Sequence, residues 1–305
     1  MKNAMTTNPI GPRAAPALVM ASGDSRRMIT TLLIAVAILA APVGIICRSA
    51  EPVTNAVTDE GWELVWRDEF DGTTIDSSKW QHEVNARGGG NNELQYYTAR
   101  PENSRVTNGV LVIETRRENY TDLEGTRQYT SARLRTRRKA DWKYGRFEIR
   151  AKLPAGKGIW PAIWLLPRDN TYGGWPVGGE IDIMESVGHE PGRVHGTLHY
   201  ADDAKGHLFQ GAYFDLPQGN FAEDFHVFRL DWEPNEFRWY VDGKLYQTQT
   251  NWHTRKHEFP APFDQNFYLV LNTAVGGNWP GNPDATTAFP QQFVIDYVRV
   301  FQRKK

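Results

Sequence analysis

Three carboxylates lie within six residues of an apolar segment, at Glu180, Asp182 and Glu185. The residues between them are isoleucine and methionine, types that favour a β-strand. Alternate side chains of a strand share a face, so Glu180 and Asp182 point the same way, roughly 7 Å apart along the chain. Glu185, three residues beyond Asp182, would face the other side. One extra residue near Ile183-Met184, a β-bulge, would return it, and bulges concentrate beside active sites. We therefore expect three acids on one strand face.

Paired carboxylates without an evident cofactor indicate glycoside hydrolysis. A retaining glycosidase needs a carboxylate nucleophile and a second carboxyl group that donates and later accepts a proton, about 5–5.5 Å away. We expect Glu180 to be the nucleophile, Glu185 the acid/base, and Asp182 the group that adjusts their pKa values, because neighbouring like charges raise proton affinity. Spacing alone does not fix the order of the two glutamate roles. A solvated strand face or a Ca²⁺ site is the alternative.

Aromatic residues gather near the acids in sequence. Trp160 and Trp164 are four residues apart and would share one face of a strand, whereas Trp175 lies in a loop rich in Gly and Pro. Flat rings suit the apolar faces of pyranose sugars, although burial in the core is the usual fate of large aromatics. His195 and His199 would also share a face, without the cysteine ligands common at zinc sites. His199 is either a hydrogen-bonding partner of the sugar or a structural histidine.

At this point the chain resembles the laminarinase-like members of glycoside hydrolase family sixteen, which are retaining endo-β-glucanases of jelly-roll fold. The resemblance spans roughly Gly61 to Gln302. It is carried by Glu180-Ile-Asp-Ile-Met-Glu185, Trp160-Pro-Ala-Ile-Trp-Leu-Leu-Pro167, Asn91-Asn-Glu-Leu-Gln-Tyr-Tyr-Thr98 and Ile295-Asp-Tyr-Val-Arg-Val300. It implies that Glu180 is the nucleophile and Glu185 the proton donor. Met184 separates this chain from the non-bulged lichenases and xyloglucan transglycosylases of that family.

The same resemblance implies a set of sugar-contacting residues and a metal site. The residues that would approach the sugar are Asn92, Arg133, Trp160, Trp164, Trp175 and His199. Gly109 and Asp296 match a structural calcium site remote from the cleft, in which backbone carbonyls do much of the ligating. No cofactor is implied for catalysis itself.

The chain beyond Glu60 has the pattern of an all-β domain. Segments rich in β-branched and aromatic residues alternate with Gly- and Pro-rich connections, and long helical periods are absent. The predicted strands are Trp62–Phe70, Val110–Arg116, Arg146–Lys152, His226–Trp232, Phe267–Thr273 and Phe293–Phe301. Glu236–Val241 and Lys244–Thr248 flank Asp242-Gly243, a strong hairpin signal. We expect an antiparallel β-sandwich, a concanavalin-like jelly roll with a concave substrate cleft. The loop within 272–282, with Asn278 and Trp279, is expected at the rim.

Composition agrees with a soluble enzyme, and the resemblance implies a β-glucan polysaccharide as its partner. The chain has 305 residues, 40% hydrophobic, and a formal net charge of −1, so no global field would draw it to nucleic acid. The basic stretch Arg133–Lys139 is expected to form an exposed strand edge and its turn, with a polyanion-binding patch as the alternative. We expect one catalytic domain over residues 60–303, acting as a monomer.

The N-terminal region differs from the rest. Residues 28–46 are almost entirely apolar and follow Ser25-Arg26-Arg27, the pattern of an export leader over residues 1–50. The apolar length also suits an uncleaved membrane anchor. Residues 51–59 are polar and are expected to be a linker. Cys47, the single cysteine, falls in the leader, so the domain has no thiol nucleophile and no internal disulfide. We expect an exported protein.

The sequence thus predicts an endo-acting β-1,3-glucan hydrolase that retains anomeric configuration by a two-carboxylate mechanism. One alternative is a galactan hydrolase of the same fold, acting on agar or carrageenan. The other is a non-catalytic carbohydrate-binding sandwich, which would be expected to lack one of the two terminal glutamates of the acid motif.

Overall fold

The computed structural model describes residues 61–203 and 206–304, which belong to one compact unit, Pro52–Lys305. The predicted leader, the apolar segment 28–46, Cys47 and the linker 51–59 lie outside the described residues. Within the part of the chain that the structure describes, no helix has the length and apolar character needed to span a bilayer.

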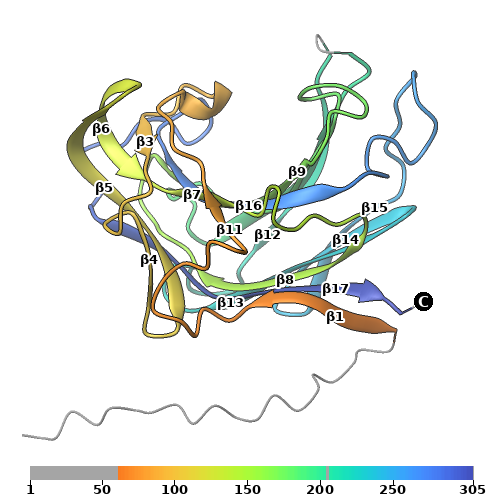
Figure 1. Ribbon diagram of the computed structural model, residues 1–305, viewed down its shortest axis with the longest axis horizontal. Coiled ribbons are helices and arrows are strands. Elements are labelled where there is room, and N and C mark those ends of the chain that lie inside the picture. The colour runs from red at the N-terminus through yellow and green to blue at the C-terminus, as the bar shows by residue number, and fades with distance from the viewer. Residues whose placement is uncertain (1–60, 204–205, 305) are drawn as a thin grey trace, which may run out of the picture. The chain divides into compact units, whose positions relative to one another are not determined.

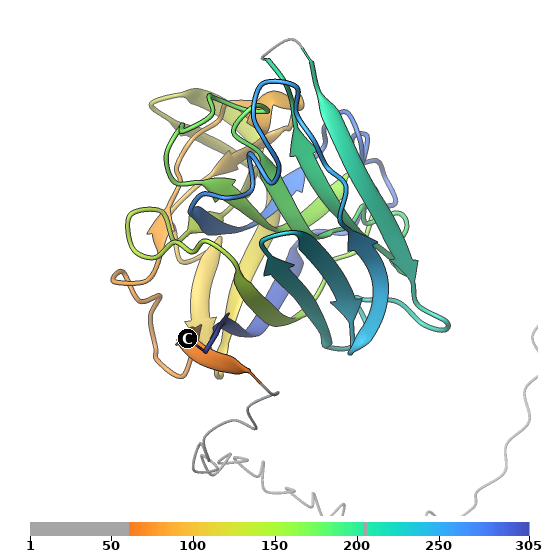
Figure 2. The same ribbon diagram turned by 90° about the vertical axis from the view of Figure 1, so that its right-hand side faces the viewer.

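Two β-sheets pack face to face (Figures 1 and 2). The ten strands of the larger sheet are β1 Trp62–Asp68, β3 Gln95–Tyr97, β4 Ser104–Thr107, β5 Val110–Asp122, β6 Gly125–Ser131, β8 Gly145–Lys152, β13 His226–Glu233, β14 Glu236–Val241, β15 Lys244–Gln249 and β17 Gln291–Arg303. The seven strands of the smaller sheet are β2 Gln81–His82, β7 Arg133–Arg135, β9 Ile159–Pro167, β10 Glu180–Glu185, β11 Arg193–Tyr200, β12 Leu208–Asp215 and β16 Phe267–Val275.

The order of strands shows the long crossovers of a jelly roll. The larger sheet runs β15-β14-β13-β8-β17-β5-β6-β3, with β1 added to β17 and β4 to β5. The smaller runs β12-β11-β10-β9-β16-β7-β2. Among the named strand pairs only β3 and β6 run parallel. The predicted antiparallel sandwich is confirmed.

The predicted strands all form; several are longer than predicted, whereas β1 ends at Asp68, two residues before its predicted end. β5 continues six residues past Arg116, to Asp122, because β6 pairs with its second half to form a projecting hairpin. The Asp242-Gly243 turn joins β14 and β15 as predicted. Both of its residues have positive φ, 49° and 76°. Positive φ at both positions is required by the two-residue turn whose twist matches that of the flanking strands.

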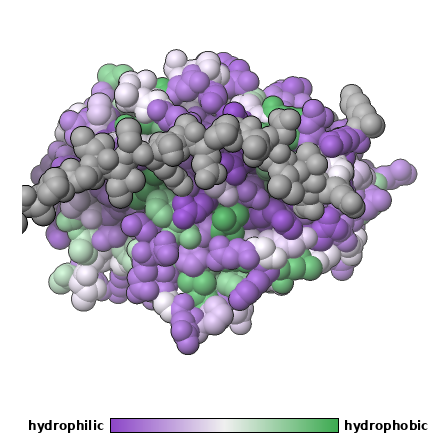
Figure 3. All heavy atoms as spheres, turned by 90° about the horizontal axis from the view of Figure 1, so that it is seen from below, coloured by the Kyte–Doolittle hydropathy of each residue, from purple (hydrophilic) through white to green (hydrophobic). Residues whose placement is uncertain are grey.

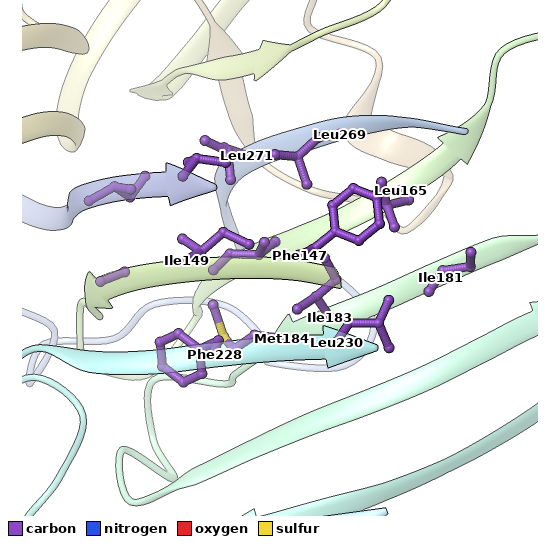
Figure 4. Packing of buried hydrophobic residues seen from close by; sticks show 14 of the residues in the cluster. Phe147, Ile149, Leu165, Ile181, Ile183, Met184, Phe228, Leu230, Leu269 and Leu271 are labelled. Carbon is purple, nitrogen blue, oxygen red and sulfur yellow. The ribbon is translucent and has the colours of Figure 1, made fainter. Parts of the chain in front are cut away.

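The core lies between the two sheets and is built from both. Figure 4 shows Phe147 and Ile149 of β8 beside Leu165 of β9 and Leu269 of β16, all fully buried. Apolar side chains alternate along these strands, and the inward ones meet those of the other sheet. The core therefore holds the smaller sheet rigidly, with its other face left for function.

The outer face of the larger sheet is polar. Seen from below, where β1 and β17 lie, the surface not covered by grey atoms is mostly hydrophilic with scattered hydrophobic patches (Figure 3). On this sheet a row of arginines surrounds Asp231, whose side chain is nearly inaccessible to solvent.

The prediction of an exposed strand edge at Arg133–Lys139 is wrong. Its first part forms β7, which pairs with β16 on one side and with the short β2 on the other. Glu83, just after β2, accepts hydrogen bonds from both Arg133 (3.4 Å) and Arg135 (2.5 Å). Arg133 and Arg135, which were expected to prevent pairing at a strand edge, therefore neutralise the carboxylate of Glu83, about fifty residues earlier in the chain. The predicted turn after the strand, from Thr136, does form.

Candidate active site

Strand β10 carries the predicted bulge. Against β11, Asp182 pairs with Thr197 and Glu185 with His195, so three steps on β10 oppose two on β11. Against β9, the register also shifts between Asp182 and Met184. Figure 4 labels Ile183 and Met184 among the core residues, and both are buried although they are consecutive. Because two neighbours face the core, Glu185 returns to the face that carries Glu180 and Asp182.

A cavity of about 360 Å³ lies on this face of the smaller sheet. All three acids of β10 line it, which confirms that they share one groove. The other lining residues come from the 89–93 loop, from β7, β9 and β16, and from the loop before β10. They are Gly89, Gly90, Asn91, Glu93, Arg133, Trp160, Ala162, Trp164, Leu166, Trp175, Asn272 and Ala274.

Each acid has a distinct partner. The indole nitrogen of Trp160 donates a hydrogen bond of 2.9 Å to Glu185. Glu180 receives one from the indole of Trp175. His199 Nε2 lies 3.0 Å from Asp182 Oδ2, and Asp182 is only 1% exposed. The predicted roles of Trp160 and Trp175 as cleft residues are thus supported by contacts with the acids themselves.

Burial raises the pKa of all three acids. The pKa of Glu185 is raised to about 8 by burial and by the charge of Asp182, against the opposing effects of His199 and Trp160. The pKa of Glu180 lies well above its usual value for the same first two reasons. Desolvation raises the pKa of Asp182 as well. Three acids this close cannot all ionise together, so at neutral pH at least one holds a proton, as an acid catalyst requires.

Arg133, Trp164 and Asn272 form one wall of the cavity. The indole nitrogen of Trp164 donates to the Asn272 side-chain oxygen at 2.8 Å, and Asn272 in turn donates to the Tyr97 hydroxyl at 3.2 Å. The guanidinium of Arg133 lies over the rings of Tyr97 and Trp164, 4.8 and 5.1 Å from their centroids. These contacts fix the Trp164 ring at the cavity wall. Trp160 and Trp164 share the groove face, as predicted.

Asn92 is placed at the rim rather than among the lining residues. Its side chain is exposed and donates a hydrogen bond of 2.9 Å to Asn278. Its neighbour Glu93 is buried, accepts a hydrogen bond from Gln95, and lines the cavity. Gly89 has a positive φ of 55°, and a side chain there would collide with Glu93. The 89–93 loop is therefore shaped around Glu93, with Asn92 linking it to the 278 loop.

Sequence reasoning missed Asn272, Glu93 and His207. Asn272 fell where the predicted strand Phe267–Thr273 overlaps the expected rim loop 272–282, and a lone amide among apolar residues was an available signal. Glu93 lies in the segment Asn91–Thr98 that carries the family resemblance, but only its neighbour Asn92 was predicted there as a site residue. His207 lies against His199, with 2.8 Å between Nδ1 of His199 and Nε2 of His207. No local pattern relates these two histidines, because β12 must first pair with β11.

Glu180, Asp182 and His199 also form a cluster of candidate metal ligands. One ligand atom from each lies within 4.8 Å of the others, and no other such group of three occurs among the described residues. His199 Nε2 lies 3.0 Å from Asp182 Oδ2, an atom to which the described residues give no hydrogen bond, and His199 Nδ1 lies 2.8 Å from His207 Nε2. The imidazole is thus placed between Asp182 and His207, beside the two acids.

The residues implied for calcium, Gly109 and Asp296, lie near each other in the fold. β17 pairs Ile295 with Leu111 of β5, which puts Asp296 beside the turn that ends at Gly109. One carboxylate oxygen of Asp296 is bonded to Arg150 at 2.6 Å. Calcium takes six to eight oxygen ligands, so backbone carbonyls would have to supply most of them. Calcium binding there stays a prediction.

Comparisons with known proteins agree on one family. The family model for glycosyl hydrolases family 16 matches residues 91–299. A beta-glucanase of Rhodothermus marinus is 52% identical over 252 residues, which cover 79% of this chain and 85% of that protein. A glucan endo-1,3-beta-glucosidase of Cryptopygus antarcticus is 42% identical, covering 78% and 91%. The solved laminarinase catalytic domain from Thermotoga maritima MSB8 matches with a TM-score of 0.72 and 46% identity, covering 81% of this chain and all of that one.

Proposed function

The chain belongs to glycosyl hydrolases family 16, and from that premise we propose that it is an endo-acting hydrolase of β-1,3-glucan that retains anomeric configuration. The observation that carries the mechanism is the β10 bulge, which directs Glu180 and Glu185 into one groove. Both terminal acids are present and face the cavity, which favours an enzyme over a binding module.

Glu180 attacks the anomeric carbon while Glu185 protonates the departing glycosidic oxygen. This forms a glycosyl ester on Glu180 and releases the first product. Glu185, now ionised, takes a proton from water as the water attacks the anomeric carbon, and the ester bond to Glu180 breaks. The configuration is inverted twice and so retained. The mechanism needs no cofactor.

The environment of each acid supports this assignment. The pKa of Glu185, about 8, keeps it protonated at neutral pH and ready to donate. Burial and the charge of Asp182 raise the pKa of Glu180 well above its usual value, whereas His199 and the hydrogen bond from Trp175 oppose this shift and favour the carboxylate that attacks. Asp182 lies between the two glutamates, and its charge raises the pKa of both. His199 is a positioning residue, because it contacts Asp182 rather than the reacting atoms.

Azide rescue tests which glutamate is which. In Glu180→Gly, azide can enter the vacated space and attack an activated aryl glucoside directly, giving an α-glycosyl azide by a single inversion. In Glu185→Ala, Glu180 still forms the ester, and azide attacks it from the opposite side, giving a β-glycosyl azide. The exposed Glu102→Gln is the matched control and should keep full activity. The opposite anomers would exchange the two roles, and near-native hydrolysis of laminarin by either variant would overturn the mechanism.

A substrate panel tests the linkage. We expect reducing-sugar release from laminarin, and little from agarose or carrageenan. Arg133 is the one cation among the described lining residues, and Glu83 pairs with it, so the groove offers no free charge to a sulfated galactan. Faster release from carrageenan than from laminarin would favour the galactan alternative.

Export and calcium binding extend this proposal. The apolar segment 28–46 supports export, and cell fractionation followed by N-terminal sequencing would separate a cleaved leader from an anchor. Gly109 and Asp296 support a structural calcium ion, which would raise the unfolding temperature on titration and lower it with a chelator. We also propose a monomer, to be checked by light scattering.

A further inference from the structure

The bulge of β10 begins at the peptide group that joins Asp182 to Ile183. Against β9 the strand register shifts between Asp182 and Met184. Against β11 it shifts between Asp182 and Glu185. Ile183 is therefore the extra residue, and it enters the core together with Met184 (Figure 4). A bulge interrupts the ladder of backbone hydrogen bonds, so a buried carbonyl group at this point needs a donor from elsewhere.

That donor comes from the other sheet. The indole nitrogen of Trp239, on β14, donates a hydrogen bond of 2.8 Å to the backbone oxygen of Asp182, and the contact is buried. Trp239 itself has no exposed surface. The carbonyl of Asp182 is thus directed into the core, whereas its carboxylate lines the groove on the other face of the strand. One side chain of the larger sheet holds the backbone of the catalytic strand.

Gly196 leaves the space for this contact. It lies on β11 opposite the bulge, between the residues that pair with Asp182 and Glu185. A Cβ atom at Gly196 would lie 2.4 Å from Cδ1 and 2.6 Å from Nε1 of Trp239, closer than such atoms approach. Gly196 is absent from the residues with positive φ, so its backbone conformation does not call for glycine. The close approach of the indole is the reason that this position has no side chain.

A second tryptophan provides a comparison within the same core. Trp232, on β13, is also fully buried. The rings of Trp232 and Trp239 both stack on Phe237, with centroids 5.8 and 5.6 Å away. The indole nitrogen of Trp232, however, has no hydrogen-bond partner among the residues that the structure describes. The two indoles therefore share their packing and differ in what their N–H groups do.

We propose that Trp239 is a positioning residue for hydrolysis, because its hydrogen bond to the Asp182 carbonyl fixes the bulge that turns Glu185 into the groove beside Glu180. The inference rests on the proposed function, since it assigns a role in that reaction. The peptide plane after Asp182 sets the direction in which the chain continues to Glu185. Retention requires the two carboxyl groups to lie about 5–5.5 Å apart. Trp239 does not touch the reacting atoms and acts through this separation.

Loss of the indole N–H would leave the Asp182 carbonyl buried without its donor. An unpaired buried carbonyl is costly, so the peptide group would rotate toward another donor or toward water. Either movement changes the direction of Glu185 relative to Glu180. A misplacement of about 1 Å in a catalytic group can reduce the rate about 100-fold. The expected consequence is a loss of kcat, with binding of the glucan in the groove little changed.

Two matched variants test this role, Trp239→Phe and Trp232→Phe. Each removes a similar volume from the same core, so both should lower the unfolding temperature. The first also removes a hydrogen bond, and the second does not. At a temperature where both are folded, Trp239→Phe should lower kcat on laminarin about 10- to 100-fold and change KM less than about twofold. Trp232→Phe should keep a native kcat.

Two further changes act on the hydrogen bond and keep a ring of full size. Benzothienylalanine has the shape of tryptophan with sulfur in place of the N–H group. Placed at position 239 it should reproduce the loss of kcat, and placed at position 232 it should leave kcat unchanged. Gly196→Ala keeps Trp239 and displaces its indole, so it should also lower kcat. These proteins decide the question if Trp239→Phe does not fold.

The outcomes separate this inference from the proposed function. If the wild type releases no reducing sugar from laminarin, the proposed function fails. If the wild type is active and benzothienylalanine at position 239 leaves kcat native, only the role of Trp239 is overturned. Equal losses of kcat in Trp239→Phe and Trp232→Phe would overturn it as well, because they would show a general effect of core packing.

Discussion

Two aspartates of this protein, Asp182 and Asp231, are each only 1% exposed but lie in opposite surroundings. Asp231 is on β13 in the larger sheet. Arg146 of β8 donates two hydrogen bonds to it, at 2.7 and 2.9 Å, and two further arginines, Arg229 and Arg238, lie within 4 Å. Each carboxylate oxygen therefore lies near two guanidinium groups.

Asp182 has the reverse arrangement. It lies between two other carboxylates on β10, and its nearest cationic candidate is the imidazole of His199. Burial raises the pKa of Asp182 accordingly. The comparison shows that burial of an acid does not identify its role. The neighbouring charges do identify it. The structural acid, Asp231, is surrounded by arginines, whereas the functional acid, Asp182, lies beside two other acids that exchange protons.

The largest expected effect is that of Asp231 on the free energy of unfolding. Asp231→Ala removes the carboxylate that Arg146, Arg229 and Arg238 share, so three neighbouring guanidinium groups lose a common anionic neighbour. We expect the free energy of unfolding to fall by about 3–5 kcal/mol. Chemical denaturation measures this, and the folded fraction should retain a native kcat on laminarin. An unchanged denaturation midpoint would show that the arginines find other partners.

Asp182→Asn should act in the opposite way. Here no fixed cation loses its partner, so stability should be equal to wild type or higher. We expect kcat to fall about 100-fold, or about 2.7 kcal/mol in activation free energy, because the group that shares protons with Glu180 is gone. Steady-state kinetics and thermal unfolding on one preparation measure both. A variant that loses stability without losing kcat would remove the distinction between the two aspartates.

Glu185→Gln should stabilise the fold at alkaline pH. The pKa of Glu185 is about 8 in the folded protein, above the usual value near 4.5, so the folded state disfavours the ionised form. Wild type therefore loses stability as the pH rises from about 4.5 to 8, and glutamine removes that loss. Because the group is partly exposed to cleft water, we expect a gain of about 1–3 kcal/mol at pH 8. The gain should vanish near pH 4; a pH-independent gain would point to a packing effect.

The smallest expected effect concerns the hydrogen bond from Trp160 to Glu185. This bond favours the ionised carboxylate, so Trp160→Phe should raise the pKa of Glu185. The alkaline limb of the kcat/KM profile should then move to higher pH, by about half a unit or roughly 0.7 kcal/mol. Asp182→Asn should move the same limb to lower pH, since it removes a negative neighbour. Shifts in the same direction for both variants would contradict this electrostatic account.

Much of the catalytic strand could be predicted from its own six residues. Two adjacent apolar residues, Ile183 and Met184, break an otherwise alternating pattern, and such a break is resolved by a bulge when both must be buried. The hairpin at Asp242-Gly243 was predictable for a similar reason, because the turn needs positive φ at both positions. These are local rules, decided within a few residues.

Features that depend on contacts between residues far apart in the sequence were predicted wrongly or missed. Arg133–Lys139 gave no sign of Glu83, and the expected strand edge turned out to be an inner strand with a neutralised charge. Asn272 became a site residue only when β16 paired beside β9.

The sequence by itself determined the sandwich class, the bulge and the identity of the paired acids, because strand period and turn chemistry are set by neighbouring residues. Tertiary structure decided which buried carboxylate lies among arginines, which one shares a groove with two other acids, and which cations already have an anionic partner. Those properties depend on burial and on cross-strand register, which arise only when segments far apart in the chain come together.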